Sequence, residues 1–277
     1  MSRAAEDTVA FVTGSTDGLG RALAERLAGL GMTVHIHGRN AEKLARVTEE
    51  IVAATGNERV LPHRADLASL AEVRALADEI AALDALHLLV DNAGIGSGLP
   101  DSPERQESAD GIELRFAVNY LAGFVLTERL LPLLERSAPS RIVMVASLGQ
   151  AALDFDDPML ERSLYEGRRA YAQSKLAQIT YANGLAERLP AGVTVNSLHP
   201  ATFMPTKIVL DERGTSVDSL ERGTEATLRL AVDPALGGVS GRFFDREREA
   251  RAEAQAYDPE AQQRLRELSE ALAKGSV

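Results

Sequence analysis

Residues 8–20 have the sequence Thr8-Val9-Ala10-Phe11-Val12-Thr13-Gly14-Ser15-Thr16-Asp17-Gly18-Leu19-Gly20. The apolar run 8–13 is typical of a buried strand, and the amphipathic run 21–27 after the glycines is typical of a helix. A strand, a glycine turn and a helix in this order can cradle a pyrophosphate, because backbone N–H groups at the start of a helix face the anion. A lone glycine-rich turn is more often only a turn, so this interpretation depends on the rest of the chain.

The alternation of strand and helix continues along the chain. Further strands are expected at 33–37, 59–63, 86–90, 141–146, 193–198 and 241–244. Helices are expected at 21–27, 41–55, 68–82, 111–134, 167–189 and 217–232. Because each strand lies a crossover away from the next, the pattern predicts one α/β domain with a doubly wound parallel sheet of about seven strands, flanked by helices on both faces.

The pattern is less regular in the C-terminal part of the chain. A looser stretch without clear periodicity covers 202–216. The domain is expected to span 1–277, with 246–277 as a C-terminal helical tail of two charged amphipathic helices divided at Asp258-Pro259.

Composition narrows the setting. The chain has 277 residues, 45% of them hydrophobic, which suits one large domain. It contains no cysteine, which excludes disulfides and thiolate chemistry and fits a reducing cytoplasm. Its 41 acidic and 30 basic side chains give a net charge of −11, which disfavours nucleic acid as a partner. No signal-like segment or apolar run of about 18 residues is apparent, so a soluble cytoplasmic protein without a membrane span is expected.

A second feature lies in the predicted helix 167–189. Tyr171 and Lys175 are four residues apart, about one helical turn, so their side chains project from one face. A nearby ammonium favours the phenolate and lowers the phenol pKa from its usual value near ~10. Such a tyrosine can exchange a proton with an alcohol or a carbonyl. Alone, the pair is more often a structural helix-face contact, but with the upstream phosphate cradle it indicates a redox enzyme.

The combined pattern resembles the short-chain dehydrogenase/reductase family over most of the chain. The Gly14-x-x-x-Gly18-x-Gly20 spacing matches the cofactor turn of that family, and Asn92-Ala93-Gly94 resembles the core of its Asn-Asn-Ala-Gly motif. Asp91 stands where the first asparagine is usual, and Ala201 stands where a glycine usually follows Pro200. A carboxylate cannot donate a hydrogen bond as an amide can, and alanine lacks the backbone freedom of glycine.

Residues 118–124, the long insertion between Ser147 and Tyr171, and residues 169–177 are similar to the retinol-dehydrogenase-like branch and its relatives around the WW-domain oxidoreductases. The resemblance implies a Rossmann-type fold. It also implies interconversion of a ketone or aldehyde and an alcohol by hydride transfer, on lipophilic or natural-product-like substrates.

The resemblance also implies residue roles. The catalytic tetrad falls on Asn119, Ser147, Tyr171 and Lys175. Tyr171 acts as acid or base, Ser147 donates a hydrogen bond to the substrate oxygen, and Lys175 lowers the tyrosine pKa and bonds the nicotinamide ribose. Asn119 kinks its helix and anchors a proton-relay water. Cofactor contacts are expected at Gly14, Ser15, Thr16, Asp17, Gly18, Leu19, Gly20, Arg39, Asn40, Asp66, Leu67, Asn92, Ala93, Gly94, Tyr171, Lys175, Pro200 and Thr202.

The end of the second expected strand bears on the choice of cofactor. It continues as His37-Gly38-Arg39-Asn40, with no carboxylate before Glu42 to hold a ribose 2′-hydroxyl. Arg39 can pair with a 2′-phosphate instead, so NADP(H) is favoured, although Asp17 lies in the turn and NAD(H) stays possible.

Several alternatives stay open on sequence alone. An NAD-dependent hydroxysteroid-type dehydrogenase and a non-catalytic redox sensor are the competing functions. Leu153, Phe155 and Phe203 either line an apolar pocket or pack against one another. His35 and His37 share a strand face without a third ligand nearby, so no metal site is expected. Members of the family commonly pair through the helices expected at 111–134 and 167–189, so a homodimer or homotetramer is expected.

Overall fold

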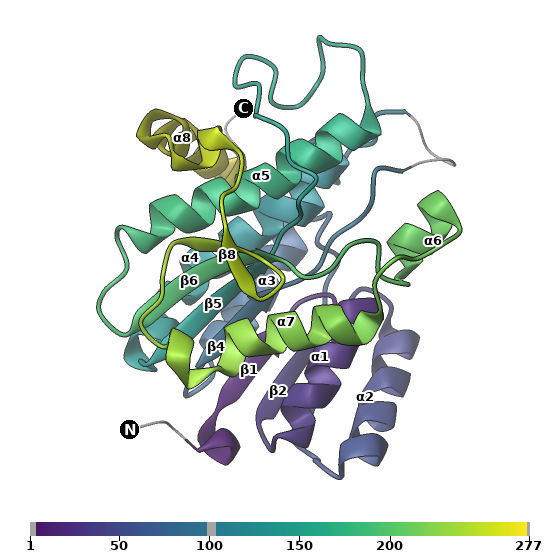
Figure 1. Cartoon of the computed structure of the whole chain (residues 1–277), viewed down its shortest axis with the longest axis vertical. Helices are drawn as coiled ribbons and strands as arrows, with labels where there is room; N and C mark the ends of the chain where they lie inside the picture. The colour runs from purple at the N-terminus through teal and green to yellow at the C-terminus, as the bar shows by residue number, and fades with distance from the viewer. Residues whose placement is uncertain (1–3, 99–103, 276–277) are drawn as a thin grey trace.

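A single eight-stranded sheet forms the centre of the computed structural model, which describes residues 4–98 and 104–275 (Figure 1). The strand order is β3-β2-β1-β4-β5-β6-β7-β8, and every neighbouring pair up to β7 is parallel. The strands are β1 (Val9–Val12), β2 (Thr33–Gly38), β3 (Val60–Arg64), β4 (Leu88–Asp91), β5 (Ser140–Val145), β6 (Val193–His199), β7 (Arg242–Asp245) and β8 (Arg248–Ala250). The order reverses between β1 and β4, which confirms the predicted doubly wound α/β fold.

The α-helices cover both faces of the sheet. They are α1 (Gly18–Gly29), α2 (Ala41–Thr55), α3 (Leu70–Ala81), α4 (Ala122–Arg136), α5 (Gly167–Ala186), α6 (Lys207–Arg213), α7 (Leu220–Val232) and α8 (Pro259–Lys274). Short 3₁₀ segments occur at η1 (Ala5–Asp7), η3 (Pro234–Leu236) and η4 (Ala254–Tyr257), and η2 (Phe116–Leu121) is π-helical.

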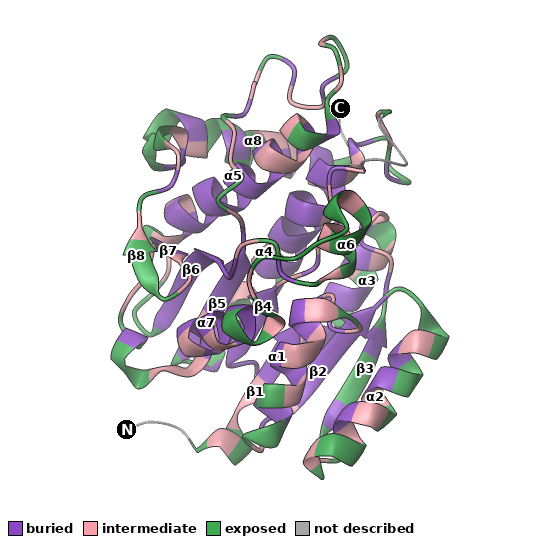
Figure 2. Cartoon of the chain, turned by 45° about the vertical axis from the view of Figure 1, so that its right-hand side comes forward, coloured by how far each residue is buried: buried purple, intermediate pink, exposed green. Residues whose placement is uncertain are grey.

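Two separate cores result from the alternation of side chains along the strands. Ala10 and Val12 of β1 face the core covered by α1, α2 and α7, whereas Phe11 faces the core covered by α3, α4 and α5. Figure 2 shows this burial on the strands and on the inner faces of the helices, with the exposed residues turned outward. The carboxyl ends of the parallel strands therefore meet along one edge of the sheet, where a site can form.

The C-terminal segment differs from the predicted pair of helices. Residues 248–250 form the antiparallel edge strand β8, which pairs with β7 through Phe243 and Ala250, and only α8 forms a full α-helix. Arg246 makes the connecting turn at φ 57°. Exposed Arg248 and Glu249 suit an edge strand, because charged side chains there discourage pairing with other chains. The sheet accordingly has one strand more than the seven expected.

Helix α8 packs against α5 and reaches the segment before α4. The hydroxyls of Tyr120 in η2 and Ser269 in α8 are 2.6 Å apart, and both residues are buried. Asn183 of α5 donates to the carbonyl of Ala256 at 2.9 Å. The C-terminal helix thus supports the same segment that carries Asn119.

One segment among residues 4–98 and 104–275, Phe116–Arg136, is long and apolar enough to match the length and composition of a membrane span. It has 21 residues and a mean hydropathy of 1.2, and 72% of it is buried inside the domain. Its apolar residues belong to the core under the sheet.

Candidate active site

The glycine turn between β1 and α1 is built as the sequence predicts. Gly14 has φ 64°, a conformation that favours glycine. At Gly20 a Cβ would lie 2.4 Å from the carbonyl oxygen of Gly14 and 2.3 Å from the Asn92 amide nitrogen, so only glycine fits. Asn92 donates to the Thr13 carbonyl at 2.9 Å and thereby ties the loop after β4 to the turn.

His37 supports the same turn from β2. Its Nδ1 accepts from the backbone N–H of Gly14 at 3.1 Å, and its Nε2 donates to the Ala65 carbonyl at 3.1 Å. This pattern requires a neutral ring, and burial lowers the pKa of His37 to about 4. His35 contacts His63 at 2.7 Å, and the described part of the chain holds no group of three His, Cys, Asp or Glu side chains arranged for a metal.

Four predicted catalytic residues converge at the carboxyl ends of β4 and β5. Ser147 follows β5, and Tyr171 and Lys175 project from α5, with Lys175 Nζ 5.9 Å from the Tyr171 ring centroid. Asn119 lies in the π-helical η2, so the predicted break in its helix is present. The regular helix α4 consequently begins only at Ala122.

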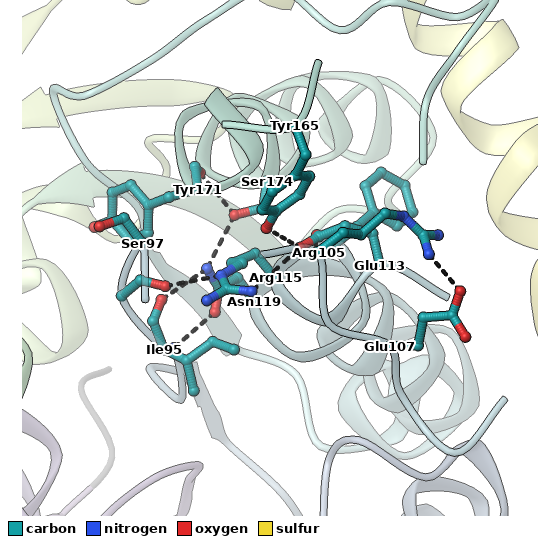
Figure 3. Close-up of polar contacts among 12 residues, drawn as sticks. Ile95, Ser97, Arg105, Glu107, Glu113, Arg115, Asn119, Tyr165, Tyr171 and Ser174 are labelled. Carbon is teal, nitrogen blue, oxygen red and sulfur yellow. Dashed lines mark hydrogen bonds and ion pairs between the residues drawn. The ribbon is translucent and has the colours of Figure 1, made fainter. Parts of the chain in front are cut away.

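The Asn119 side chain is held by the protein on both of its polar atoms (Figure 3). Its Oδ1 accepts from the backbone N–H of Ile95 at 2.7 Å, and its Nδ2 donates to the Ile95 carbonyl at 3.1 Å and to the Ser174 hydroxyl at 2.9 Å. Asn119 thus fixes the loop after β4 against α5.

The expected effect of Lys175 on Tyr171 is wrong in this structure. Burial raises the pKa of Tyr171 above its usual value, a hydrogen bond with Ser147 opposes the rise, and the Glu212 carboxylate adds to it. Lys175 points its ammonium elsewhere, because Nζ donates to the Val145 carbonyl and to Gln178 Oε1, both at 2.9 Å. Tyr171 is therefore a neutral phenol here.

Lys175 shares its buried position with Asp91, at the end of β4. Burial lowers the pKa of Lys175 to about 8, and the Asp91 charge opposes that fall. Burial raises the pKa of Asp91 to about 6, with Lys175 opposing the rise. The two groups therefore stabilise each other's charged form.

A basic cavity of about 490 Å³ lies beside the glycine turn, at the end of β2. It is lined by Thr16, Arg39, Asn40, Glu42, Lys43, Arg46 and Lys207. The position of Arg39 agrees with the sequence argument, and three further cations join it. Lys43 Nζ lies 2.6 Å from Asp17 Oδ2 and lowers the pKa of that carboxyl, so the turn carboxylate is neutralised by an ion pair.

Helix α6 links this cavity to the loop after β4, near the predicted catalytic residues. Lys207 at its start lines the basic cavity. One turn further on, Glu212 accepts from the Ser97 hydroxyl at 2.8 Å, in the loop after β4. Arg115 is fully buried below that loop and donates to the Gly96 carbonyl at 3.1 Å, while Tyr165 bonds Glu113 (Figure 3).

Some predicted cofactor residues have structural roles. The Leu67 side chain is buried in the core, whereas Asp66 beside it is partly exposed. Asn40 caps α2 by accepting from Lys43 N at 2.8 Å, although it also lines the basic cavity. Thr202 is bonded to Arg246 at 2.9 Å and to Asp218 through its backbone.

The loop after β6 and the predicted apolar pocket residues are placed as follows. Pro200 is buried directly after β6, and Ala201 does not have positive φ, so the missing glycine causes no strain there. Leu153 is in the core, which favours packing over pocket lining, and Phe155 packs against that core. Phe203 is 40% exposed, with the Arg213 guanidinium 3.9 Å from its ring centroid.

Sequence reasoning missed Lys43, Arg46 and Lys207 around the basic cavity, and Gln178 and Glu212 near the catalytic residues. The first two had a detectable signal, because they follow Arg39 on one face of a capped helix. Gln178 also had one, because it lies three residues after Lys175 in the same predicted helix. Lys207 and Glu212 had none, since their partners lie on distant segments and α6 is a short helix within a stretch without periodicity.

Comparisons of the sequence and of the structure with known proteins all point to one family. The model of the short chain dehydrogenase family matches residues 8–215. Retinol dehydrogenase 13 of Mus musculus is 35% identical over 92% of this chain and 80% of its own length. Polyprenol dehydrogenase of Homo sapiens is 34% identical over 94% of this chain and 83% of its own length.

A solved structure from Escherichia coli CFT073, described as a short chain dehydrogenase complexed with NADPH, superimposes with a TM-score of 0.70. It is 28% identical, over 87% of this chain and 97% of that one.

Proposed function

Since this chain belongs to the short chain dehydrogenases, we propose that it is an NADP(H)-dependent oxidoreductase that interconverts a carbonyl and an alcohol. The convergence of Ser147, Tyr171 and Lys175 beside the glycine turn carries the proposal. A serine hydroxyl, a phenol and an ammonium at one edge of the sheet can bind a carbonyl oxygen and deliver a proton to it.

The cradle fits a dinucleotide. A Cβ at Gly14 would meet Ala93 and a Cβ at Gly20 would meet the Gly14 carbonyl, so glycines are needed for the tight turn that would present backbone N–H groups at the start of α1 to a pyrophosphate. Asn92 braces that turn, and Lys175 lies near Gly94, where a Cβ would be 3.5 Å from Nζ. A bound nicotinamide would supply the hydride.

Side chains of the protein would supply the proton that a reduced carbonyl oxygen takes up. Ser147 Oγ accepts from the backbone N–H of Gly149 at 3.0 Å, and its hydroxyl is hydrogen-bonded to Tyr171, so a substrate oxygen bound between the two could receive the serine O–H in place of the phenol. Tyr171 keeps its proton at neutral pH because burial raises its pKa, so it serves as the acid in carbonyl reduction. In alcohol oxidation the same phenol must lose its proton before it can act as the base.

The basic cavity supports NADP(H) over NAD(H). Arg39, Lys43, Arg46 and Lys207 surround the place where a 2′-phosphate would lie, at the end of β2. Asp17 offsets only Lys43, with which it is paired. Glu42 is the one carboxylate in the lining, and Arg39, Arg46 and Lys207 outnumber it.

We propose a lipophilic or natural-product-like substrate. The relatives named retinol dehydrogenase and polyprenol dehydrogenase support this class. Leu148, directly after the catalytic serine, is 47% exposed, and Phe203 before α6 is 40% exposed, so apolar groups are available near the site.

The test follows loss of NADPH absorbance with a panel of aldehydes, ketones and quinones that includes retinal. We expect turnover by the wild type and a loss of at least 100-fold in kcat for Tyr171→Phe, with the fold retained by circular dichroism. Tyr257→Phe is the matched control, because that tyrosine is exposed and its hydroxyl accepts from the backbone N–H of Ala252, outside the proposed site. Equal turnover by Tyr171→Phe and the wild type would refute the role of Tyr171.

A further inference from the structure

Asp91 occupies an enclosed position at the end of β4. Its residue is 4% exposed, and its Oδ1 accepts from the Thr13 hydroxyl at 3.3 Å. On the opposite side, a Cβ at Gly123 would lie 1.8 Å from Asp91 Oδ2, so the carboxyl fills the space that a side chain there would need. Such a carboxyl cannot reach water, and its charge needs a partner.

The fold places Lys175 beside this carboxyl: Asp91 pairs in register with Met144 of β5, and Lys175 Nζ donates to the carbonyl of Val145, the next residue of that strand. Asp91 and Lys175 each favour the charged form of the other. Gln178 lies between them: its Oε1 accepts from Lys175 Nζ at 2.9 Å, and its amide lies near enough to Asp91 to lower the carboxyl pKa. Gln178 Nε2 itself is buried and makes no hydrogen bond to any described residue.

The surroundings offer Lys175 no other counter-charge among the described residues. From α5 the titratable neighbour is Tyr171, which is neutral, and β5 offers the Val145 carbonyl. From η2 comes the Asn119 amide, and β4 contributes Asp91. An asparagine at position 91 would fill the same space but would leave the ammonium buried without a negative charge.

We propose that Asp91 is a positioning residue that keeps Lys175 charged and seated between Val145 and Gln178, and so sets the pH range over which the enzyme works. The proposal rests on the proposed function for its effect on turnover. Its effect on Lys175 itself can be measured without any substrate.

The direct test is a ¹³C NMR titration of the lysine Cε signals. Lysine occurs only at Lys43, Lys175, Lys207 and Lys274 in the sequence, and Lys175→Met assigns the buried one. In the wild type we expect Lys175 to titrate near pH 8, well below an exposed lysine. In Asp91→Asn we expect its midpoint to fall by about one pH unit or more.

Two variants sharpen the result. Asp84→Asn removes the same charge from an exposed loop and should leave the Lys175 midpoint in place. Asp91→Asn/Gln178→Glu returns a carboxylate beside Nζ and should bring the midpoint back to the wild-type value or above. An unchanged Lys175 midpoint in folded Asp91→Asn would overturn the proposal, as would failure of the double variant to restore it.

Turnover then separates this proposal from the proposed function. In Asp91→Asn the alkaline limb of kcat for carbonyl reduction should move to lower pH by the same amount as the NMR midpoint. A wild type without turnover but with the NMR shift would refute the oxidoreductase assignment alone. Turnover with no shift in either measurement would refute the role of Asp91 alone.

Discussion

Glu212 on α6 accepts hydrogen bonds from both the backbone N–H and the hydroxyl of Ser97, at 2.5 and 2.8 Å, across 115 positions of sequence. These hydrogen bonds hold α6 against the loop after β4. They also bring a carboxylate close enough to raise the pKa of Tyr171. One side chain thus links α6 to Tyr171, the residue that we propose as the proton donor.

Replacing that carboxylate should change the pH dependence of alcohol oxidation. In Glu212→Gln the Tyr171 phenol loses a nearby negative charge, so its pKa falls and the acidic limb of kcat for oxidation moves to lower pH. Asp211→Asn, one position earlier and exposed, is the control and should leave the limb in place. If the pH profile of kcat were the same in Glu212→Gln as in Asp211→Asn, the Glu212 charge would have no effect on Tyr171.

The basic cavity predicts a selective loss of cofactor affinity. Arg39→Ala should weaken NADPH binding by roughly 5–150-fold, the equivalent of about 1–3 kcal/mol for a lost charge-assisted contact, and leave NADH binding unchanged. Titration of intrinsic or cofactor fluorescence measures both affinities. Arg136→Ala, on the far end of α4, should affect neither. An equal loss for the two cofactors would contradict contact with a 2′-phosphate.

The close approach at Gly20 predicts a loss of both binding and stability. In Gly20→Ala the new Cβ meets the Gly14 carbonyl, so the turn must shift, at a cost of about 1–3 kcal/mol in the free energy of unfolding. Gly29→Ala in the same helix is the control, since its nearest neighbour would be the Thr55 methyl at an ordinary 3.9 Å. Urea denaturation should show a lower free energy of unfolding, and NADPH titration a weaker affinity, for Gly20→Ala but not for Gly29→Ala.

The buried histidines predict acid sensitivity. His37 has a folded-state pKa of about 4, below the usual 6.5, so its contribution to stability is present above pH 6.5 and is lost as the pH falls towards 4. The contribution is about 3 kcal/mol for a fall of this size. Asp91 opposes this loss. Because its folded-state pKa is raised, its protonation increases the free energy of unfolding as the pH falls from 6 to 4.

Urea denaturation between pH 7.5 and 4.5 measures this balance. His37→Gln should be less stable at pH 7.5, since it loses the contact with Gly14, and should show a smaller fall in stability with acid. Asp91→Asn should show a steeper fall than the wild type. A wild-type stability that is flat over this range would contradict the buried neutral state of His37.

The sequence was sufficient for the features that depend on local pattern. Seven strands were placed within two residues of their observed ends, because buried parallel strands form short apolar runs bounded by polar turns. Tyr171 and Lys175 were identified from their four-residue spacing and from the resemblance to the family, and Gly14 to Gly20 from the spacing of the glycines between a strand and a helix. These constraints act between residues close in sequence.

The features that depend on tertiary packing could not be predicted. The sign of the Tyr171 pKa change was wrong because burial and Glu212 outweigh a lysine that turns towards Gln178. Strand β8 gains its stability from pairing with β7 rather than from its own propensity. Helix α6 is too short to give a periodic signal.

The contact between Tyr120 and Ser269 has a consequence for biosynthesis. A ribosome completes the nucleotide cradle and the helix bearing Tyr171 long before it adds Ser269, and some residues more must leave the exit tunnel before α8 can dock. Until then the π-helical turn that holds Asn119 lacks its hydroxyl partner and its apolar cover. Nascent chains arrested ahead of α8 should therefore assemble the N-terminal half of the sheet before the turn that carries Asn119 adopts its final conformation.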